Sequence, residues 1–184
     1  SNLIDGSTKA LFNADCITVT AYAGWDGVKP FVDECNKHGK GIFVWVKSSN
    51  PSGGDLQDLV MKDDKSAYEI MGHYVDSWGA DSRGESGFTS IGAVVGATYP
   101  DQAKVLREVM PNAFFLVPGF GAQGGTADDV KACFKEDGLG AIVNSSRGII
   151  FAYEKSDDYS EKEYGKAARV AVETMKSQLE QVLS

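Results

Sequence analysis

The sequence is poor in the residues that build metal centres and nucleic-acid surfaces. Its 184 residues include only two histidines, His38 and His73, and neither lies near a cluster of cysteines or acids. We therefore expect no metal site. Acidic residues outnumber basic ones by 26 to 18, which gives a formal net charge of -8. This excess argues against binding nucleic acid through a basic face.

Long apolar runs are also missing. No stretch of 18 or more apolar residues occurs, which predicts no transmembrane helix. The chain does not open with a basic segment followed by an apolar one, so nothing in it indicates secretion. The three cysteines, Cys16, Cys35 and Cys133, are odd in number and far apart. We interpret them as buried free thiols and expect a cytoplasmic protein.

The sequence does contain a regular alternation of strand and helix patterns. Runs of continuous apolar character, typical of strands buried on both faces of a parallel sheet, lie at Cys16–Ala21, Gly41–Ser48, Ile91–Ala97, Ala113–Pro118 and Ala141–Ser146. Helical patterns lie at Val28–Gly39, Ser66–Gly79, Tyr99–Pro111, Thr126–Gly138 and about Ser160 to Val182. This alternation predicts an α/β fold of βαβ units, either a doubly wound sheet or five-eighths of a (β/α)₈ barrel.

Two hydrophilic stretches interrupt this alternation. We expect the segments Asn50–Lys65 and Gly79–Ser90 to form solvent-exposed loops. Functional loops of parallel α/β folds follow the carboxyl ends of the strands. The residues just after each predicted strand therefore decide the function.

The stretch "LVPGFGAQGG" begins in the fourth predicted strand, which ends at Pro118, and continues into a loop with few large side chains. Its four glycines let the chain turn and expose backbone N–H groups to an anion. Thr126 then caps a helix whose N-terminus favours negative charge. Arg147 follows the next strand and offers a planar cation suited to phosphate. The glycine-rich loop and Arg147 together predict a phosphate site. The alternatives are that the glycines form only a flexible turn and that Arg147 forms a surface ion pair.

The loops after the first two strands are less specific. Ser48, Ser49 and Asn50 could bind a heterocycle that carries amides, or could form an ordinary turn ahead of Pro51. Asp26 could be catalytic, although a helix N-cap is the simpler interpretation. The aromatic residues Tyr22, Trp25 and Trp45 are expected in the core or in a pocket wall.

Several motifs in order resemble one enzyme family. The segments that carry the resemblance span about Asp15 to Tyr153 and are "TAYAGWDGVKPF", "VKSSNPSG", "GAVVGAT", "LREVMPNAFFLVPGFGAQGG" and "IVNSSRGIIFAY". They resemble orotidine 5'-phosphate decarboxylase, in particular its longer bacterial subfamily. The resemblance implies a (β/α)₈ (TIM) barrel and a homodimeric carboxy-lyase that converts orotidine 5'-monophosphate (OMP) to UMP and CO₂ in pyrimidine biosynthesis. It also implies that no metal and no organic cofactor take part.

The resemblance further implies roles for individual residues. The phosphate of the nucleotide is expected at Gln123, Gly124, Ser146 and Arg147. The pyrimidine is expected at Ser49 and Pro118. Pro51, Ser52 and Gly53 are expected in a loop that closes over the substrate.

The sequence departs from the family at the catalytic centre. The family places its acids and lysines in an Asp-x-Lys-x-x-Asp motif at the ends of the first three strands. The segment Asp63-Asp64-Lys65 begins like this motif, but Tyr68 stands where the second acid is needed. We therefore expect residues 1–184 to be one partial barrel domain that covers strands four to eight, with the catalytic residues N-terminal to Ser1.

Such a chain should bind phosphate weakly, release no CO₂ alone, and associate with its missing part or with another copy. Two other interpretations stay open from the residues: a different phosphate-binding barrel enzyme, such as a sugar-phosphate lyase, and a non-catalytic, doubly wound module that binds a phosphorylated ligand.

Overall fold

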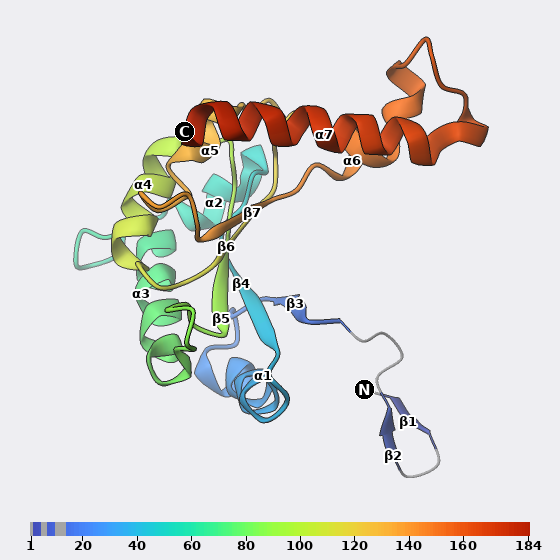
Figure 1. Cartoon of the computed structure of the whole chain (residues 1–184). Coiled ribbons are helices and arrows are strands. Elements are labelled where there is room, and N and C mark those ends of the chain that lie inside the picture. The colour runs from blue at the N-terminus through green and yellow to red at the C-terminus, as the bar shows by residue number, and fades with distance from the viewer. Residues whose placement is uncertain (1, 5–6, 10–13) are drawn as a thin grey trace.

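The computed structural model describes residues 2–4, 7–9 and 14–184. The first two short strands, β1 (Asn2–Ile4) and β2 (Ser7–Lys9), pair antiparallel as a hairpin. In Figure 1 this hairpin lies apart from the helices of the main body.

The main sheet has five parallel strands in the order of the sequence. They are β3 (Cys16–Val19), β4 (Gly41–Lys47), β5 (Ile91–Val95), β6 (Phe115–Val117) and β7 (Ala141–Val143). A doubly wound sheet reverses its strand order at a switch point, where ligands bind. This sheet has no reversal, because each crossover adds the next strand on the same side. The chain therefore adopts part of a (β/α)₈ barrel, and the doubly wound alternative is wrong.

The predicted helices are present, and shorter ones accompany them. The α-helices are α1 (Trp25–His38), α2 (Gly54–Gln57), α3 (Ala67–Gly79), α4 (Pro100–Val109), α5 (Ala127–Lys131), α6 (Ser146–Ile150) and α7 (Tyr164–Leu183). Short 3₁₀ turns occupy Pro51–Gly53, Ala80–Ser82, Ala152–Lys155 and Glu161–Glu163. No helix among the described residues is both long enough and apolar enough to cross a membrane.

Three helical segments differ from the sequence prediction. Helix α5 ends at Lys131, seven residues before the predicted end at Gly138. Helix α1 begins at Trp25 after Gly24, so Asp26 lies in its first turn and is not the N-cap. The positive φ of 80° at Gly24 lets the chain enter the helix three residues before the predicted start. The stretch expected as an open loop after β4 contains the 3₁₀ turn Pro51–Gly53 and helix α2, so it is partly helical.

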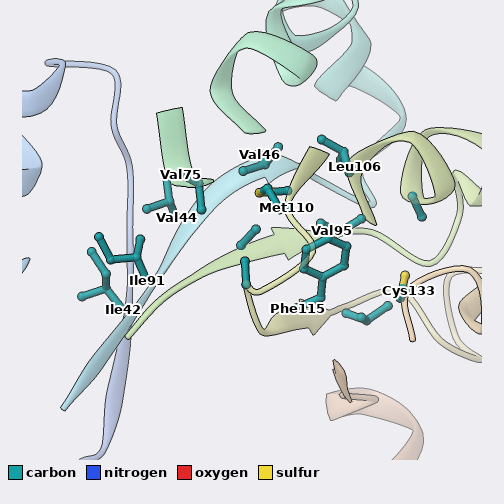
Figure 2. Close-up of a cluster of buried hydrophobic side chains, with 14 of the residues drawn as sticks. Ile42, Val44, Val46, Val75, Ile91, Val95, Leu106, Met110, Phe115 and Cys133 are labelled. Atoms are coloured by element: carbon teal, nitrogen blue, oxygen red, sulfur yellow. The ribbon is translucent and has the colours of Figure 1, made fainter. Parts of the chain in front are cut away.

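The core lies between the sheet and the helices that cover one of its faces. Alternate strand residues such as Ile42, Val44 and Phe115 belong to one buried cluster with Val75 of α3 and Leu106 of α4, and all five are fully buried (Figure 2). Alternation along a strand places every second side chain on one face. The helical layer therefore packs on the side chains of this set.

The other face of the sheet is largely open. Trp45 and Ile142 lie on it and are 45% and 51% exposed. Only β5 is buried at every residue, whereas β3 and β7 each carry exposed residues. The prediction that all strands are buried on both faces is thus wrong for β3, β4 and β7, because within the described part of the chain the helices cover only one face of the sheet. Cys16 on β3 is exposed for this reason, while Cys35 and Cys133 are buried as expected.

Candidate phosphate-binding site

The glycine-rich loop after β6 is shaped by backbone conformations that favour glycine. Gly119, Gly121 and Gly124 have φ values of 98°, 71° and 98°, in the left-handed region that side chains with a Cβ rarely adopt. The loop also closes on itself, because the Gly124 N–H donates to the Gly121 carbonyl at 2.9 Å and the Gly125 N–H donates to the Gly119 carbonyl at 3.1 Å. Gly124 thus supports the turn directly.

A small cavity lies where this loop meets the end of β7. Its volume is about 160 Å³. The residues that line it are Pro118, Gly119, Phe120, Ala122, Gln123, Asn144, Ser145, Ser146 and Arg147. The structure therefore brings Gln123, Ser146 and Arg147 together, as the sequence predicts.

Arg147 lies in the first turn of α6 and is exposed. Among residues 14–184 no carboxylate lies within ion-pair distance of its guanidinium. The surface ion pair considered as an alternative is therefore not formed within this part of the chain. A permanently charged group at the mouth of a small polar cavity is suited to an anion.

Ser145 connects the two loops and was missed from the sequence. Its hydroxyl is buried and donates to the carbonyl of Phe120 at 3.0 Å. A Cβ on Gly148 would come within 2.5 Å of the Ser145 Oγ, so the chain approaches this hydroxyl closely. The neighbouring Ser146 is exposed. Ser145 thus fixes the glycine-rich loop against the start of α6.

Asn144 precedes Ser145 and also lines the cavity. Its Oδ1 is buried and accepts no hydrogen bond from any described residue. A buried acceptor without a partner is uncommon and costs free energy. Asn144 is thus a polar group of the cavity whose hydrogen bonding is incomplete within the described part of the chain.

Ser49 lies beside the glycine-rich loop, packed between the ends of β5 and β6. A Cβ on Gly96 would come within 2.5 Å of the Ser49 nitrogen, and one on Gly119 within 2.7 Å of the Ser49 Cβ. The same position on Gly119 lies 3.1 Å from the Oε1 of Gln123. Both glycines are needed for this close approach. Ser49 therefore adjoins the group of residues around Gln123.

The residues of the expected closing loop lie outside the small cavity. Pro51 and Ser52 are exposed, and Gly53 is half-buried in the 3₁₀ turn, where its N–H donates to the Asn50 carbonyl at 2.9 Å. None of the three lines the cavity. Their role over a ligand stays a prediction.

The N-terminus of α5 is occupied by the chain's own carboxylate. Thr126 is the N-cap, as predicted, and forms a capping box with Asp129. The Asp129 Oδ2 accepts from the Thr126 N–H at 2.8 Å and from its hydroxyl at 2.7 Å. These bonds from the Thr126 hydroxyl and backbone lower the pKa of Asp129. The Thr126 N–H and hydroxyl are therefore already bonded within the chain, and two acids, Asp128 and Asp129, lie in the first turn of α5.

A larger hollow of about 1000 Å³ lies among the ends of β3 and β4 and one side of α3. Tyr22, Trp25 and Trp45 line it, as expected for a pocket wall, although Tyr22 is 85% exposed and belongs to no core. Trp25 stacks on Trp78 of α3 with ring centroids 5.2 Å apart. The lining of this larger hollow is mostly apolar and aromatic, in contrast to that of the small polar cavity.

The Asp-x-Lys segment lies in a turn ahead of α3 and does not directly follow a strand, although Asp63 lines the hollow at the ends of β3 and β4. Asp64 has a positive φ of 60°, and the Lys65 Nζ lies 3.0 Å from the Nε2 of His73. This placement agrees with the expectation that the segment is not the catalytic motif. Among residues 14–184 no group of three or more histidines, cysteines or acids is placed to hold a metal ion.

Comparison with known proteins shows to which family the chain belongs. The family described as "Orotidine 5'-phosphate decarboxylase / HUMPS family" matches residues 6–161. The chain belongs to this family. It is 44% identical to the orotidine 5'-phosphate decarboxylase of Caldicellulosiruptor bescii over 97% of its length, and 46% identical to that of Rhodopirellula baltica over 91%. The solved structure of Leishmania donovani OMP decarboxylase superposes with a TM-score of 0.69 at 30% identity, covering 91% of the chain.

The chain spans little more than half the length of these family members. It covers 57% of the C. bescii protein, 56% of the R. baltica protein and 58% of the L. donovani chain. This share is in line with five parallel strands out of the eight of a (β/α)₈ barrel.

Proposed function

We propose that this chain is the nucleotide-holding part of an orotidine 5'-phosphate decarboxylase, a carboxy-lyase that converts OMP to UMP and CO₂. The observation that carries the proposal is the meeting of the glycine-rich loop with Arg147 at one small polar cavity. In (β/α)₈ enzymes the loops after strands seven and eight commonly form a phosphate site. Here the corresponding loops are those after β6 and β7.

The substrate phosphate is proposed to bind to the side chains of Gln123 and Arg147, with Ser146 and Gly124 in the supporting backbone. The pyrimidine is proposed to lie toward Ser49 and Pro118, because Ser49 adjoins Gly119 and Pro118 lines the cavity. Pro51, Ser52 and Gly53 are proposed to cover the nucleotide.

The chemical step is proposed to depend on residues outside these 184. No Asp-x-Lys-x-x-Asp motif occurs in the sequence, and no acid or lysine lines the small cavity. In this proposal the chain supplies strands four to eight as one partial domain, and an N-terminal part supplies strands one to three. The complete protein is proposed to be a cytoplasmic homodimer that needs no cofactor. A sugar-phosphate lyase is less well supported, since the relatives named above are orotidine 5'-phosphate decarboxylases.

Removal of Arg147 tests the proposal. Arg147→Ala should weaken UMP binding by about 1.5–3 kcal/mol, because a charged hydrogen-bond donor to phosphate is lost. Isothermal calorimetry with UMP measures this change. The matched control is Arg169→Ala, since Arg169 lies on α7 and pairs with the exposed Glu173. Unchanged affinity in Arg147→Ala would show that the phosphate is not held there.

A further inference from the structure

The most unusual side chain near the proposed site is a fully buried lysine. Lys47 is the last residue of β4 and is 0% exposed. Lysine is almost never fully buried unless its charge is paired. Lys47 stands two residues before Ser49, at the start of the segment proposed to face the pyrimidine. Its contacts therefore bear on how that segment is held.

The charge of Lys47 is met by one acid and two aromatic rings. Its Nζ donates to the Oδ1 of Asp58 at 2.5 Å, and Asp58 is 45% exposed. The same Nζ lies 4.4 Å from the ring centroid of Tyr99 and 5.5 Å from that of Tyr68. Both distances suit a cation–π contact. Lys47 thus reaches from the end of a central strand to an acid at the surface.

A second contact joins the same two pieces of chain. The Ser48 N–H donates to the Oε1 of Gln57 at 3.0 Å. Gln57 ends α2, and Asp58 follows it directly. At the end of β4, Lys47 therefore binds Asp58, eleven positions later, and Ser48 binds Gln57, nine positions later. These contacts close residues 48–58 into a compact loop whose ends are tied together.

This loop carries every residue proposed to meet or cover the pyrimidine end except Pro118. Ser49 lies at its base, held by the Thr98 hydroxyl, which donates to the Ser49 carbonyl at 3.3 Å. Pro51 to Gly53 form its tip. The base of the loop at Ser48 and Ser49 is buried, whereas its tip at Pro51 and Ser52 is exposed and is not held by the hydrophobic core. The Lys47–Asp58 contact fixes its far end.

We propose that Lys47 is a positioning residue for nucleobase recognition: through Asp58 it fixes the loop 48–58 so that Ser49 faces the nucleobase. The ligand class is a nucleotide with a pyrimidine-type base, and the inference rests on the proposed function. Stability alone is a weak reason for such a pair, because burying the lysine costs much of what the ion pair returns. A well-packed apolar side chain would serve the core as well.

The first test is hydrogen–deuterium exchange of the loop. In Lys47→Met and in Asp58→Asn, the amides of Ser48, Gly53 and Asp58 should exchange about tenfold faster or more, since a hydrogen bond to a charged group contributes at least one factor of ten. The amides of β5 should keep their wild-type rates. Lys47→Arg should exchange as slowly as the wild type, because arginine keeps the positive charge at this position. The control is Lys29→Met, which removes the exposed pair between Lys29 and Asp33.

The second test separates the two ends of the nucleotide. Lys47→Met should lower the affinity for UMP about tenfold and leave that for inorganic phosphate unchanged, because the glycine-rich loop and Arg147 are untouched. General loss of structure would lower both affinities. If Lys47→Met does not fold, Asp58→Asn serves in its place, because Asp58 is half-exposed and is the partner in the same contact.

The outcomes are distinct. Wild-type exchange at Ser48, Gly53 and Asp58, or equal acceleration in β5, would overturn the positioning role. Equal losses for UMP and phosphate would overturn it as well. If Arg147→Ala keeps full UMP affinity while loop exchange in Lys47→Met accelerates, the proposed function fails and Lys47 is a loop anchor without a part in base recognition.

Discussion

At the scale of single residues, burial separates the three thiols. Burial raises the pKa of Cys133 to about 12, although the nearby Arg107 cation partly opposes this, and burial also raises the pKa of Cys35. Partial burial and the neighbouring Asp15 raise the pKa of Cys16 as well, but Cys16 lies on an edge strand and is exposed, so access and not the pKa sets it apart. A raised pKa leaves less thiolate at a given pH, and the thiolate is the reactive form.

We therefore expect iodoacetamide to modify Cys16 first in the folded protein. Cys35 and Cys133 should react only after unfolding, because their thiols are buried and the reagent cannot reach them. Mass spectrometry of the labelled peptides over time measures the three rates. A rate for Cys133 equal to that for Cys16 would contradict the described packing.

The sequence predicted the residues whose chemistry is visible without packing. Gln123 and Arg147 stand out by type and position, and both line the cavity. Ser145 and Lys47 do not stand out in the sequence. The buried Ser145 is the same residue type as the exposed Ser146 beside it, and a lysine is normally a surface residue. Alternation along β7 places Ser145 on the same face as Ala141 and Val143. Alternation along β4 would instead place Lys47 on the exposed side with Trp45, and Lys47 is buried past an irregularity of the strand register between these two residues.

At the scale of elements, helix α5 depends on its cap. Asp129→Ala should lower the free energy of unfolding at pH 7 by about 1 kcal/mol or less, as for other partly exposed caps. The hydrogen bonds from Thr126 lower the pKa of Asp129 in the folded state. Its contribution is thus present above the pKa of the unfolded chain and is lost as the pH falls through the folded value.

Urea denaturation at several pH values measures this contribution. The difference between wild type and Asp129→Ala should shrink as the pH falls below about 4, near the ordinary pKa of aspartate. The control is Asp128→Ala, which changes the neighbouring exposed acid in the same turn. A difference that persists undiminished in acid would show that the cap does not act through the carboxylate.

The pattern of apolar residues predicted the strands, the helices and their order well, because each element buries apolar residues that recur at a regular spacing. It did not predict which strands are edges, since β3 and β7 read as apolar as β5. It also missed the helical turns after β4. Those residues are fixed by Lys47 and Gln57, which lie outside any local pattern.

At the scale of the whole molecule, the sheet carries one covered face and one open face. The exposed Trp45 and Ile142 and the two edge strands are what a segment of a barrel presents where further strands would continue it.

We expect this chain alone to release no CO₂ from OMP, because it lacks the acids and lysines of the proposed chemical step. Assay of the purified chain for CO₂ measures this directly, and robust turnover would refute the proposed division of labour.

The central claim is that the loops after β6 and β7 hold the phosphate of a nucleotide. Titration of the isotope-labelled chain with UMP, followed by amide chemical shifts, tests it most directly. The account predicts that the largest shifts occur at Gln123, Gly124, Ser146 and Arg147, with smaller ones near Ser49. Shifts confined to the aromatic hollow around Trp25 and Trp78, or no shifts at all, would contradict it.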